Sequence, residues 1–185
     1  MSAARGAART GGAGRPARAG RAASGGPALV AHIDGGARGN PGPAGYGVSV
    51  QSSSGDPVAE IYGFLGETTN NVAEYAALLA LLEFAVGARV GSLAVRSDSQ
   101  LLVRQIAGEY RVKDPNLKIL HAAARRLMES IPAATVVHVP REENHAADAL
   151  ANLAMDLRTS SHPLPRALRD LPRRPAQPGL FRDRR

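Results

Sequence analysis

Four acidic residues stand at points in the sequence where carboxylates from separate segments could meet. Asp34 ends the apolar run "ALVAHID" and Asp98 ends "SLAVRSD", and each run predicts a strand. Glu74 lies in the first turn of a long apolar helical segment, and Asp148 is one of the few polar residues on the inner part of the last one. Because sites in α/β sheets form beyond the carboxyl ends of strands, these acids are candidates for one crevice.

The chemistry that such a group of acids favours is the binding of a divalent cation. Four carboxylates brought close together repel one another and raise their own pKa values unless a cation neutralises them. Hard oxygen ligands with open positions suit Mg²⁺ or Mn²⁺. The chain has no cysteine, so any metal must be held by oxygen or imidazole, and a cysteine nucleophile is excluded.

Each acid also has an ordinary structural interpretation. Asp34 could be a turn residue, and Asp98 could cap the helix that follows it. Glu74 lies three residues after Asn71 and could complete a capping box, and Asp148 could be a solvent-facing helix charge. Spacing alone leaves these interpretations open.

The elements that must position the acids follow a clear order along the chain. Hydrophobic patterning predicts strands over residues 28–34, 45–53, 57–65, 92–98 and 134–140, and helices over residues 70–88, 99–110, 115–131 and 143–156. The order βββαβααβα, without an internal repeat, predicts an α/β fold with a five-stranded mixed sheet flanked by helices. The helix over residues 70–88 is apolar around nearly its whole circumference, which indicates burial against the sheet.

Composition favours one globular domain with basic ends. Residues 1–28 hold five arginines and no acid, residues 156–185 hold eight arginines and three aspartates, and the part between them is net −3 within a total of +7. We expect a disordered Arg/Gly/Ala-rich arm over residues 1–28, a domain over 29–156, and an extended or disordered Pro/Arg-rich tail over 157–185. An alternative interpretation of residues 1–28 is an organellar transit peptide. A transit peptide needs an amphipathic helix, which the scattered glycines disfavour.

The same composition bears on the surroundings of the protein. With 185 residues, of which 44% are hydrophobic, the chain has room for one core. The lack of cysteine excludes a disulfide framework and favours a reducing compartment, so we expect a cytoplasmic location. The apolar segment over residues 70–88 is too short and too charged to span a membrane, so we expect no membrane partner, and we expect a monomer.

The sequence segments around the four acids resemble those of a known family. In chain order the segments read "DGGARGNPGPAGYG", "TTNNVAEYAALLALLEFA", "SDSQLLVRQI" and "REENHAADALANLA". Together they resemble the four signature segments of type I ribonuclease H, in the family's order, over about residues 29–155. The resemblance implies the ribonuclease H-like fold and endonucleolytic hydrolysis of the RNA strand of RNA–DNA hybrids. It also places Asp34, Glu74, Asp98 and Asp148 at the four metal-binding positions.

The resemblance further implies a role for each acid in two-metal-ion catalysis. Asp34 would bridge both Mg²⁺ or Mn²⁺ ions, and Asp98 and Asp148 would hold the ion near the attacking water. Glu74 would face the ion near the leaving group and the adjoining ribose. The product would carry a 5′ phosphate.

Several residues match family positions that contact the hybrid: Gly35, Asn40, Thr69, Asn70, Asn71 and Gln100. Glycines after Asp34 would let backbone amides approach the minor groove, where 2′-hydroxyls mark the RNA strand. Thr69 and Asn71 match positions near the DNA phosphate and the adjacent base edges. Helix capping is the alternative for Asn70 and Asn71.

The chain departs from many bacterial members in two places. It carries Arg141 seven residues before Asp148, as the compact archaeal-like branch does, and this arginine would contact phosphate or help product leave. His145 is interpreted as a helix-surface residue, with an approach to the metals as the alternative. The basic protrusion of some relatives is missing, so the arginine-rich ends are expected to attract phosphate without sequence preference.

Two other function classes are alternatives to the nuclease. One is a non-catalytic module that binds the hybrid or double-stranded RNA on the same fold. A binder has no need to maintain four mutually repelling acids, which favours the enzyme. Double-stranded RNA and RNA–DNA junctions are also possible substrates of the enzyme. The other class, phosphotransferases and ATPases of this superfold, needs a second copy of the fold, for which the chain is too short.

Overall fold

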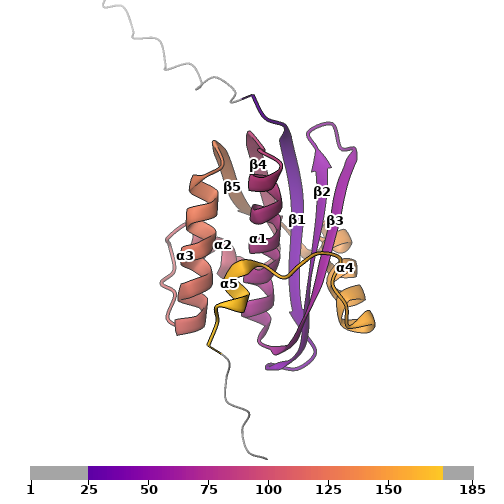
Figure 1. The fold of residues 1–185 in the computed structure, drawn as a ribbon, viewed down its shortest axis with the longest axis vertical. Coiled ribbons are helices and arrows are strands. Elements are labelled where there is room, and N and C mark those ends of the chain that lie inside the picture. Colours follow the sequence, from indigo (N-terminus) through magenta and orange to yellow (C-terminus); the bar gives the residue numbers. More distant parts are fainter. Residues whose placement is uncertain (1–24, 173–185) are drawn as a thin grey trace, which may run out of the picture.

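The computed structural model describes residues 25–172, which form a central sheet with helices on both faces (Figure 1). The strands are β1 (Ala28–Ala37), β2 (Gly42–Ser52), β3 (Pro57–Thr68), β4 (Ser92–Ser97) and β5 (Ala133–His138). They lie in the order β3-β2-β1-β4-β5. The meander β1–β2–β3 is antiparallel, whereas β4 pairs in parallel with both β1 and β5. The predicted five-stranded mixed sheet is confirmed.

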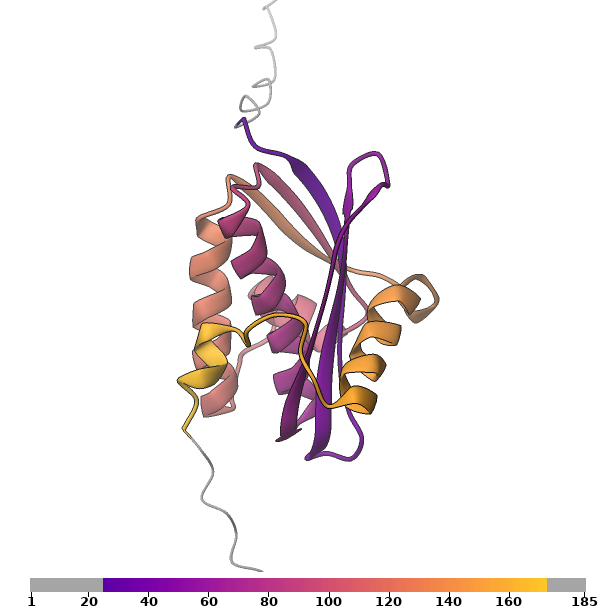
Figure 2. The ribbon, with the colours of Figure 1, turned by 45° about the vertical axis from the view of Figure 1, so that its right-hand side comes forward.

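The helices divide between the two faces of the sheet. They are α1 (Asn70–Gly87), α2 (Gln100–Ile106), α3 (Pro115–Glu129), α4 (His145–Leu157) and the short α5 (Arg166–Arg169), with a 3₁₀ turn η1 (Arg141–Glu143) before α4. In Figure 2, α1 and α3 lie on one side of the sheet and α4 on the other. The predicted order βββαβααβα is thus confirmed, and η1 and α5 are additions to it. Within the described residues, no helix is long and apolar enough to cross a membrane.

Local sequence explains where the helices begin. The side chains of Thr69, Ser99 and Asp114 accept hydrogen bonds from backbone N–H groups in the first turns of α1, α2 and α3. Pro115 stands at the start of α3, where its missing N–H costs nothing. Helix α1 is buried on most of its surface, as its apolar circumference predicts, and it forms the centre of the core with the inner face of the sheet.

The glycines after Asp34 allow helices to approach the sheet. A Cβ atom on Gly35 would collide with the backbone of Ala73 and Glu74 in α1, and one on Gly47 would collide with the Ala147 carbonyl in α4. This is a different reason from the expected approach of amides to a substrate groove. Since the close contact brings α1 against β1, Gly35 places Glu74 beside the strand that carries Asp34.

The segment after α4 was expected to be an extended or disordered tail, but its described part packs on the domain. Tyr62 N in β3 donates a hydrogen bond to Ser161 Oγ at 2.9 Å, and Ser161 N donates to Tyr62 O at 2.9 Å. Leu164, Leu168 and Leu171 then pack against the core. Figure 2 shows this segment crossing from α4 to α5 on the other face.

The reason for this difference is the leucine spacing, which lets one side of a Pro- and Arg-rich segment bury apolar surface. The domain therefore continues past residue 156. The expected arm over residues 1–24 and the end of the expected tail over 173–185 lie outside the described residues.

Candidate active site

Asp34 and Asp98 lie where two parallel strands part. The pairing of β1 with β4 ends at Ile33 opposite Ser97, so Asp34 and Asp98 are the next residues on the two chains. Asp34 does not end its strand as predicted, because β1 continues to Ala37 in its pairing with β2. The turn interpretation of Asp34 is therefore wrong. The two strands instead place both acids at the same point of the sheet.

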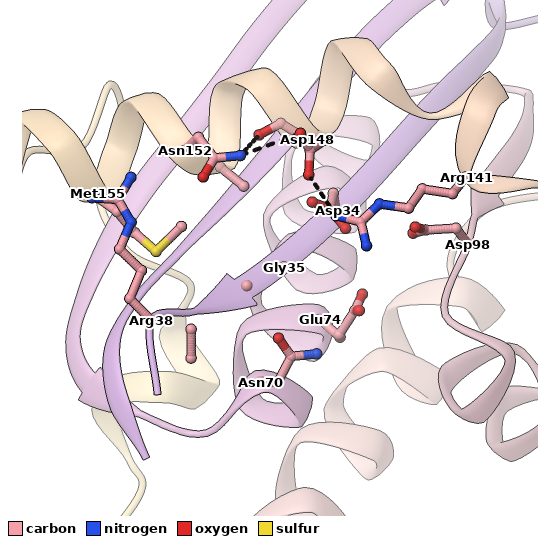
Figure 3. Close-up of a pocket in the computed structure, with 13 residues that line it drawn as sticks. Asp34, Gly35, Arg38, Asn70, Glu74, Asp98, Arg141, Asp148, Asn152 and Met155 are labelled. Atoms are coloured by element: carbon pink, nitrogen blue, oxygen red, sulfur yellow. Dashed lines mark hydrogen bonds and ion pairs between the residues drawn. The ribbon is translucent and has the colours of Figure 1, made fainter. Parts of the chain in front are cut away.

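All four predicted acids line one cleft (Figure 3). Glu74 reaches it from α1 and Asp148 from α4, so the acids come from both faces of the sheet as well as from its strands. The lining residues are Asp34, Gly35, Gly36, Ala37, Arg38, Asn70, Glu74, Asp98, Arg141, Asp148, Ala151, Asn152 and Met155. The structure thus brings the sequence-predicted carboxylates together.

Glu74 is buried, with 7% of its surface exposed. Because Thr69 is the cap of α1, Glu74 lies in the second turn, and the first-turn and capping-box interpretations are wrong. Its Oε2 has no hydrogen-bond partner among residues 25–172. Burial raises the pKa of the Glu74 carboxyl well above its usual range, with Asp34 and Asp98 adding to the rise and a hydrogen bond from Ser99 opposing it.

Asp34 has the second perturbed carboxyl of the cleft. Burial, together with repulsion from Asp98 and Asp148, raises its pKa to about 7, and the Arg141 guanidinium opposes this rise. The neighbouring carboxylates thus make the charged forms of Asp34 and Glu74 less favourable. An added cation would reverse this effect, because it favours the charged form of every carboxylate around it.

Asp98 is held by Asn144, which sequence reasoning did not single out. Asn144 Nδ2 donates to Asp98 Oδ1 at 3.0 Å and to the Ile33 carbonyl at 2.9 Å. Asn144 is 1% exposed and stands at the start of α4, where its side chain makes no capping hydrogen bond. Asp98 is not a helix cap either, because Ser99 caps α2.

Asp148 is held by two neighbours on its own side of the cleft. Its Oδ1 accepts from Arg141 Nη2 at 3.3 Å, and its Oδ2 accepts from Asn152 Nδ2 at 3.2 Å. The side chain is 39% exposed but faces the cleft, so the interpretation as a purely solvent-facing charge is wrong. Asn152 was also not predicted. Its spacing of four residues from Asp148 on one helix was the signal that could have found it.

The donor set fits divalent metal ions, although the side chains are turned to other partners. Within the part of the chain that the structure describes, no three His, Asp or Glu side chains gather closely enough to hold an ion as they stand. Asp98 faces Asn144, and Asp148 faces Arg141. The unpartnered Glu74 Oε2 and the raised pKa of Asp34 are what a cation would relieve. Binding therefore requires some side chains of the cleft to turn inward.

Comparison with known proteins decides the family. A family model described as reverse transcriptase-like matches residues 32–154. Ribonuclease HI of Halobacterium salinarum is 44% identical over 126 residues, which are 68% of this chain and 63% of that protein. The chain belongs to the type I ribonuclease H family.

Other members of the type I ribonuclease H family match in sequence and in structure. The bifunctional protein Rv2228c of Mycobacterium tuberculosis is 44% identical over 134 residues, 72% of this chain but only 37% of that protein. The structure of its N-terminal RNase H domain matches with a TM-score of 0.69 and 43% identity, over 71% of this chain and 95% of that one. LC11-RNase H1, isolated from compost and solved in complex with an RNA/DNA hybrid, matches with a TM-score of 0.67 and 44% identity, over 70% and 98%.

The residues expected to contact substrate divide into two groups in this ribonuclease H fold. Gly35 and Asn70 line the acidic cleft, and Asn40 joins them because its Oδ1 accepts from Asn70 N at 3.3 Å. Asn71 instead lines a neighbouring groove, and Gln100 is exposed at the start of α2. Because Thr69 caps α1, the capping alternative for Asn70 and Asn71 is wrong.

The two basic candidates before Asp148 are also separated. Arg141 lines the cleft from η1, with 78% of its side chain exposed. His145 begins α4, is exposed, and is not one of the residues that line the cleft of the described chain. The structure therefore favours Arg141 over His145 as the group beside the acids of the cleft.

Proposed function

We propose that this type I ribonuclease H is an active endonuclease that hydrolyses the RNA strand of RNA–DNA hybrids with Mg²⁺ or Mn²⁺. The observation that carries the proposal is the meeting of Asp34, Glu74, Asp98 and Asp148 in one cleft. The likeness to a ribonuclease H solved with an RNA/DNA hybrid supports the choice of substrate. The raised pKa values of Asp34 and Glu74 would be a burden to a protein that only bound the duplex.

The chain's own residues would divide the work by their positions. When bound, two divalent ions supply an activated water and stabilise the charge on the leaving 3′ oxygen, which leaves a 5′ phosphate on the product. Asp34 repels Glu74 as well as Asp148, so its carboxylate would help to hold both ions. Asp98 and Asp148 would serve the water side, and Glu74 the leaving-group side. The Arg141 guanidinium would contact phosphate at the cleft and help product leave.

Recognition of RNA would come from the start of α1 and the β1–β2 turn. Asn40 and Asn70 lie together beside the cleft, where amide groups can contact 2′-hydroxyls from the minor groove. Gly35 lines the same cleft, and Gln100 would contact the hybrid from α2. Thr69 and Asn71 would face the DNA strand.

Double-stranded RNA and RNA–DNA junctions are further candidate substrates of the same cleft. The monomeric state and the cytoplasmic location stay predictions.

A cleavage assay with a matched variant tests the proposal. Labelled RNA–DNA hybrid is incubated with the full chain, with and without Mg²⁺ or Mn²⁺, beside Asp98→Asn. Asparagine keeps an oxygen that can accept from Asn144 Nδ2, so the variant should fold and bind. Metal-dependent cuts in the RNA strand that the variant lacks are the expected result. Tight binding by both proteins without any cut would instead indicate a non-catalytic hybrid or double-stranded RNA binding module.

A further inference from the structure

Arg38 is a basic residue of the cleft that the proposed catalysis does not use. Two arginines, Arg38 and Arg141, stand among the described residues that line the cleft, and Figure 3 shows them at different ends of it. Arg141 is paired with Asp148, one of the four acids. Arg38 lies beside Met155 and is paired with Asp156, which is outside the lining.

The backbone holds Arg38 in place while its side chain stays available. Arg38 N donates to the Pro43 carbonyl at 2.8 Å and closes the β1–β2 turn. Gly42 packs so closely on the Arg38 carbonyl that a Cβ atom there would collide with it. The guanidinium Nη2 lies 2.7 Å from Asp156 Oδ1, and the two side chains are 51% and 59% exposed. An exposed ion pair of this kind adds little stability, so a phosphate can replace the carboxylate.

Charge gives this arginine a reason to face the cleft. Four carboxylates repel a nucleic-acid strand, and the strand has to enter the cleft for its phosphate to reach them. A planar guanidinium binds phosphate through two parallel hydrogen bonds, which makes arginine well suited to this contact. Arg38 stands four positions after Asp34, about 13 Å along an extended chain, so the contact belongs to a phosphate other than the one that is cut.

We infer that Arg38 binds a backbone phosphate of the RNA strand next to the cleavage site, and that Asp156 holds and competes for its guanidinium in the free protein. The inference rests on the proposed function, because it places the cut strand in the acidic cleft. It adds a substrate contact at the turn between β1 and β2, on the side of the cleft that α4 borders.

Two single variants separate a substrate contact from a structural ion pair, because they should act in opposite directions. Binding of an RNA–DNA hybrid is measured by titration at several salt concentrations, in the full chain carrying Asp98→Asn so that no cutting occurs. Arg38→Ala should weaken binding roughly three- to tenfold and lower the slope of log K against log salt by about one, as for one lost phosphate contact. Asp156→Asn should tighten binding up to roughly threefold, because it frees the guanidinium.

Control variants complete the test. The double variant Arg38→Ala/Asp156→Asn should bind like Arg38→Ala alone, and Arg38→Lys should keep the salt slope while it binds more weakly than wild type. Arg126→Ala removes an exposed cation from the last turn of α3 and should change binding less than Arg38→Ala does. Equal weakening by Arg38→Ala and Asp156→Asn would mean that the pair only joins the turn to α4, and would overturn the inference. Unchanged binding by Arg38→Ala would overturn it as well.

The binding measurement stays distinct from the test of the proposed function. If the wild-type chain binds the hybrid but never cuts it with Mg²⁺ or Mn²⁺, the proposed catalysis fails, while the opposite effects of the two variants on binding can still be observed. If the wild-type chain cuts the RNA strand and Arg38→Ala binds with unchanged affinity and salt slope, only the inference about Arg38 fails. Melting temperatures of the variants show whether the turn has kept its fold.

Discussion

Asn144 holds the carboxylate of Asp98 with a hydrogen bond of 3.0 Å, and the same amide group donates to the Ile33 carbonyl of β1. Replacing Asn144 with Ala would leave a buried carbonyl and a carboxylate without their donor. We expect a loss of about 1–3 kcal/mol in the free energy of unfolding, measured by urea titration. We also expect a higher Mg²⁺ concentration for half-maximal cleavage, because Asp98 would lose its orientation.

The metal dependence distinguishes positioning from stability alone. Asn144→Asp should raise the Mg²⁺ requirement further, because it places another carboxylate against Asp98. Asn116→Ala on α3 serves as the matched control and should leave the Mg²⁺ requirement unchanged. If Asn144→Ala lowers only the stability and cleaves with an unaltered Mg²⁺ requirement, Asn144 is a structural residue and does not position Asp98.

The stability of the metal-free protein should depend on the protonation of Asp34. Its pKa is about 7 in the folded chain against an ordinary value of 3.8, so the folded state keeps a proton that the unfolded state releases between these values. Stability from this group is therefore present below pH 4 and is lost as the pH rises to 7. Asp34→Asn should exceed the wild type in stability at pH 8 by one to a few kcal/mol, since a tenfold change in proton affinity corresponds to about 1.4 kcal/mol.

The pH series contains its own check. The difference between the two proteins, followed by thermal unfolding with a chelator present, should be nearly constant from pH 8 to pH 7 and should shrink steadily from pH 7 to pH 4. Mg²⁺ at pH 8 should stabilise the wild type more than Asp34→Asn. A difference that does not vary with pH would show that Asp34 titrates normally in the folded protein.

The fold and the four acids could be predicted because their signals are local. Strand and helix patterns and the four segments around the acids each occupy a short stretch of sequence. Asn144 could not be found in this way, because its partners Asp98 and Ile33 lie 46 and 111 residues away in the chain. The expected helix over residues 143–156 gave Asn144 no special place, whereas the fold uses its amide to join α4 to β1 and to the end of β4.

The predicted helix turn of Glu74 and the predicted start of the tail were wrong for related reasons. Thr69, Asn70 and Asn71 are all favourable helix caps, so sequence alone could not decide where α1 begins and which turn holds Glu74. In the tail, prolines and arginines outnumbered the leucines that pack on the core. Burial of those few side chains depends on the exposed edge of β3 being near, which only the assembled sheet shows.

The segment after α4 should contribute to stability, because it covers the edge of β3. Removing residues 159–185 deletes the Ser161 hydrogen bonds to Tyr62 and the packing of Leu164 and Leu168. We expect a loss of about 2–4 kcal/mol in the free energy of unfolding. A fully buried leucine contributes about 1.5–3 kcal/mol, and Leu164 and Leu168 are each partly buried. Size-exclusion chromatography should also show association through the exposed strand edge.

A shorter truncation is the control for this prediction. Removing residues 173–185 alone should leave the urea midpoint unchanged, since residues 160–171 supply the contacts with β3 and the core. Equal stability of the protein cut after residue 158 and of the full chain would mean that this segment merely rests on the sheet.

The arginine-rich ends should contribute to hybrid binding through charge alone. Residues 1–24 hold five arginines and residues 173–185 hold five more, against one aspartate, so both ends can release counterions from phosphates. Removing both ends should weaken binding at low salt and flatten the plot of log K against log salt, with little effect near high salt, where screening is strong. Binding titrations with Asp98→Asn as the common background measure both effects. An identical salt slope for the full and the truncated chain would reject a role of these ends in binding.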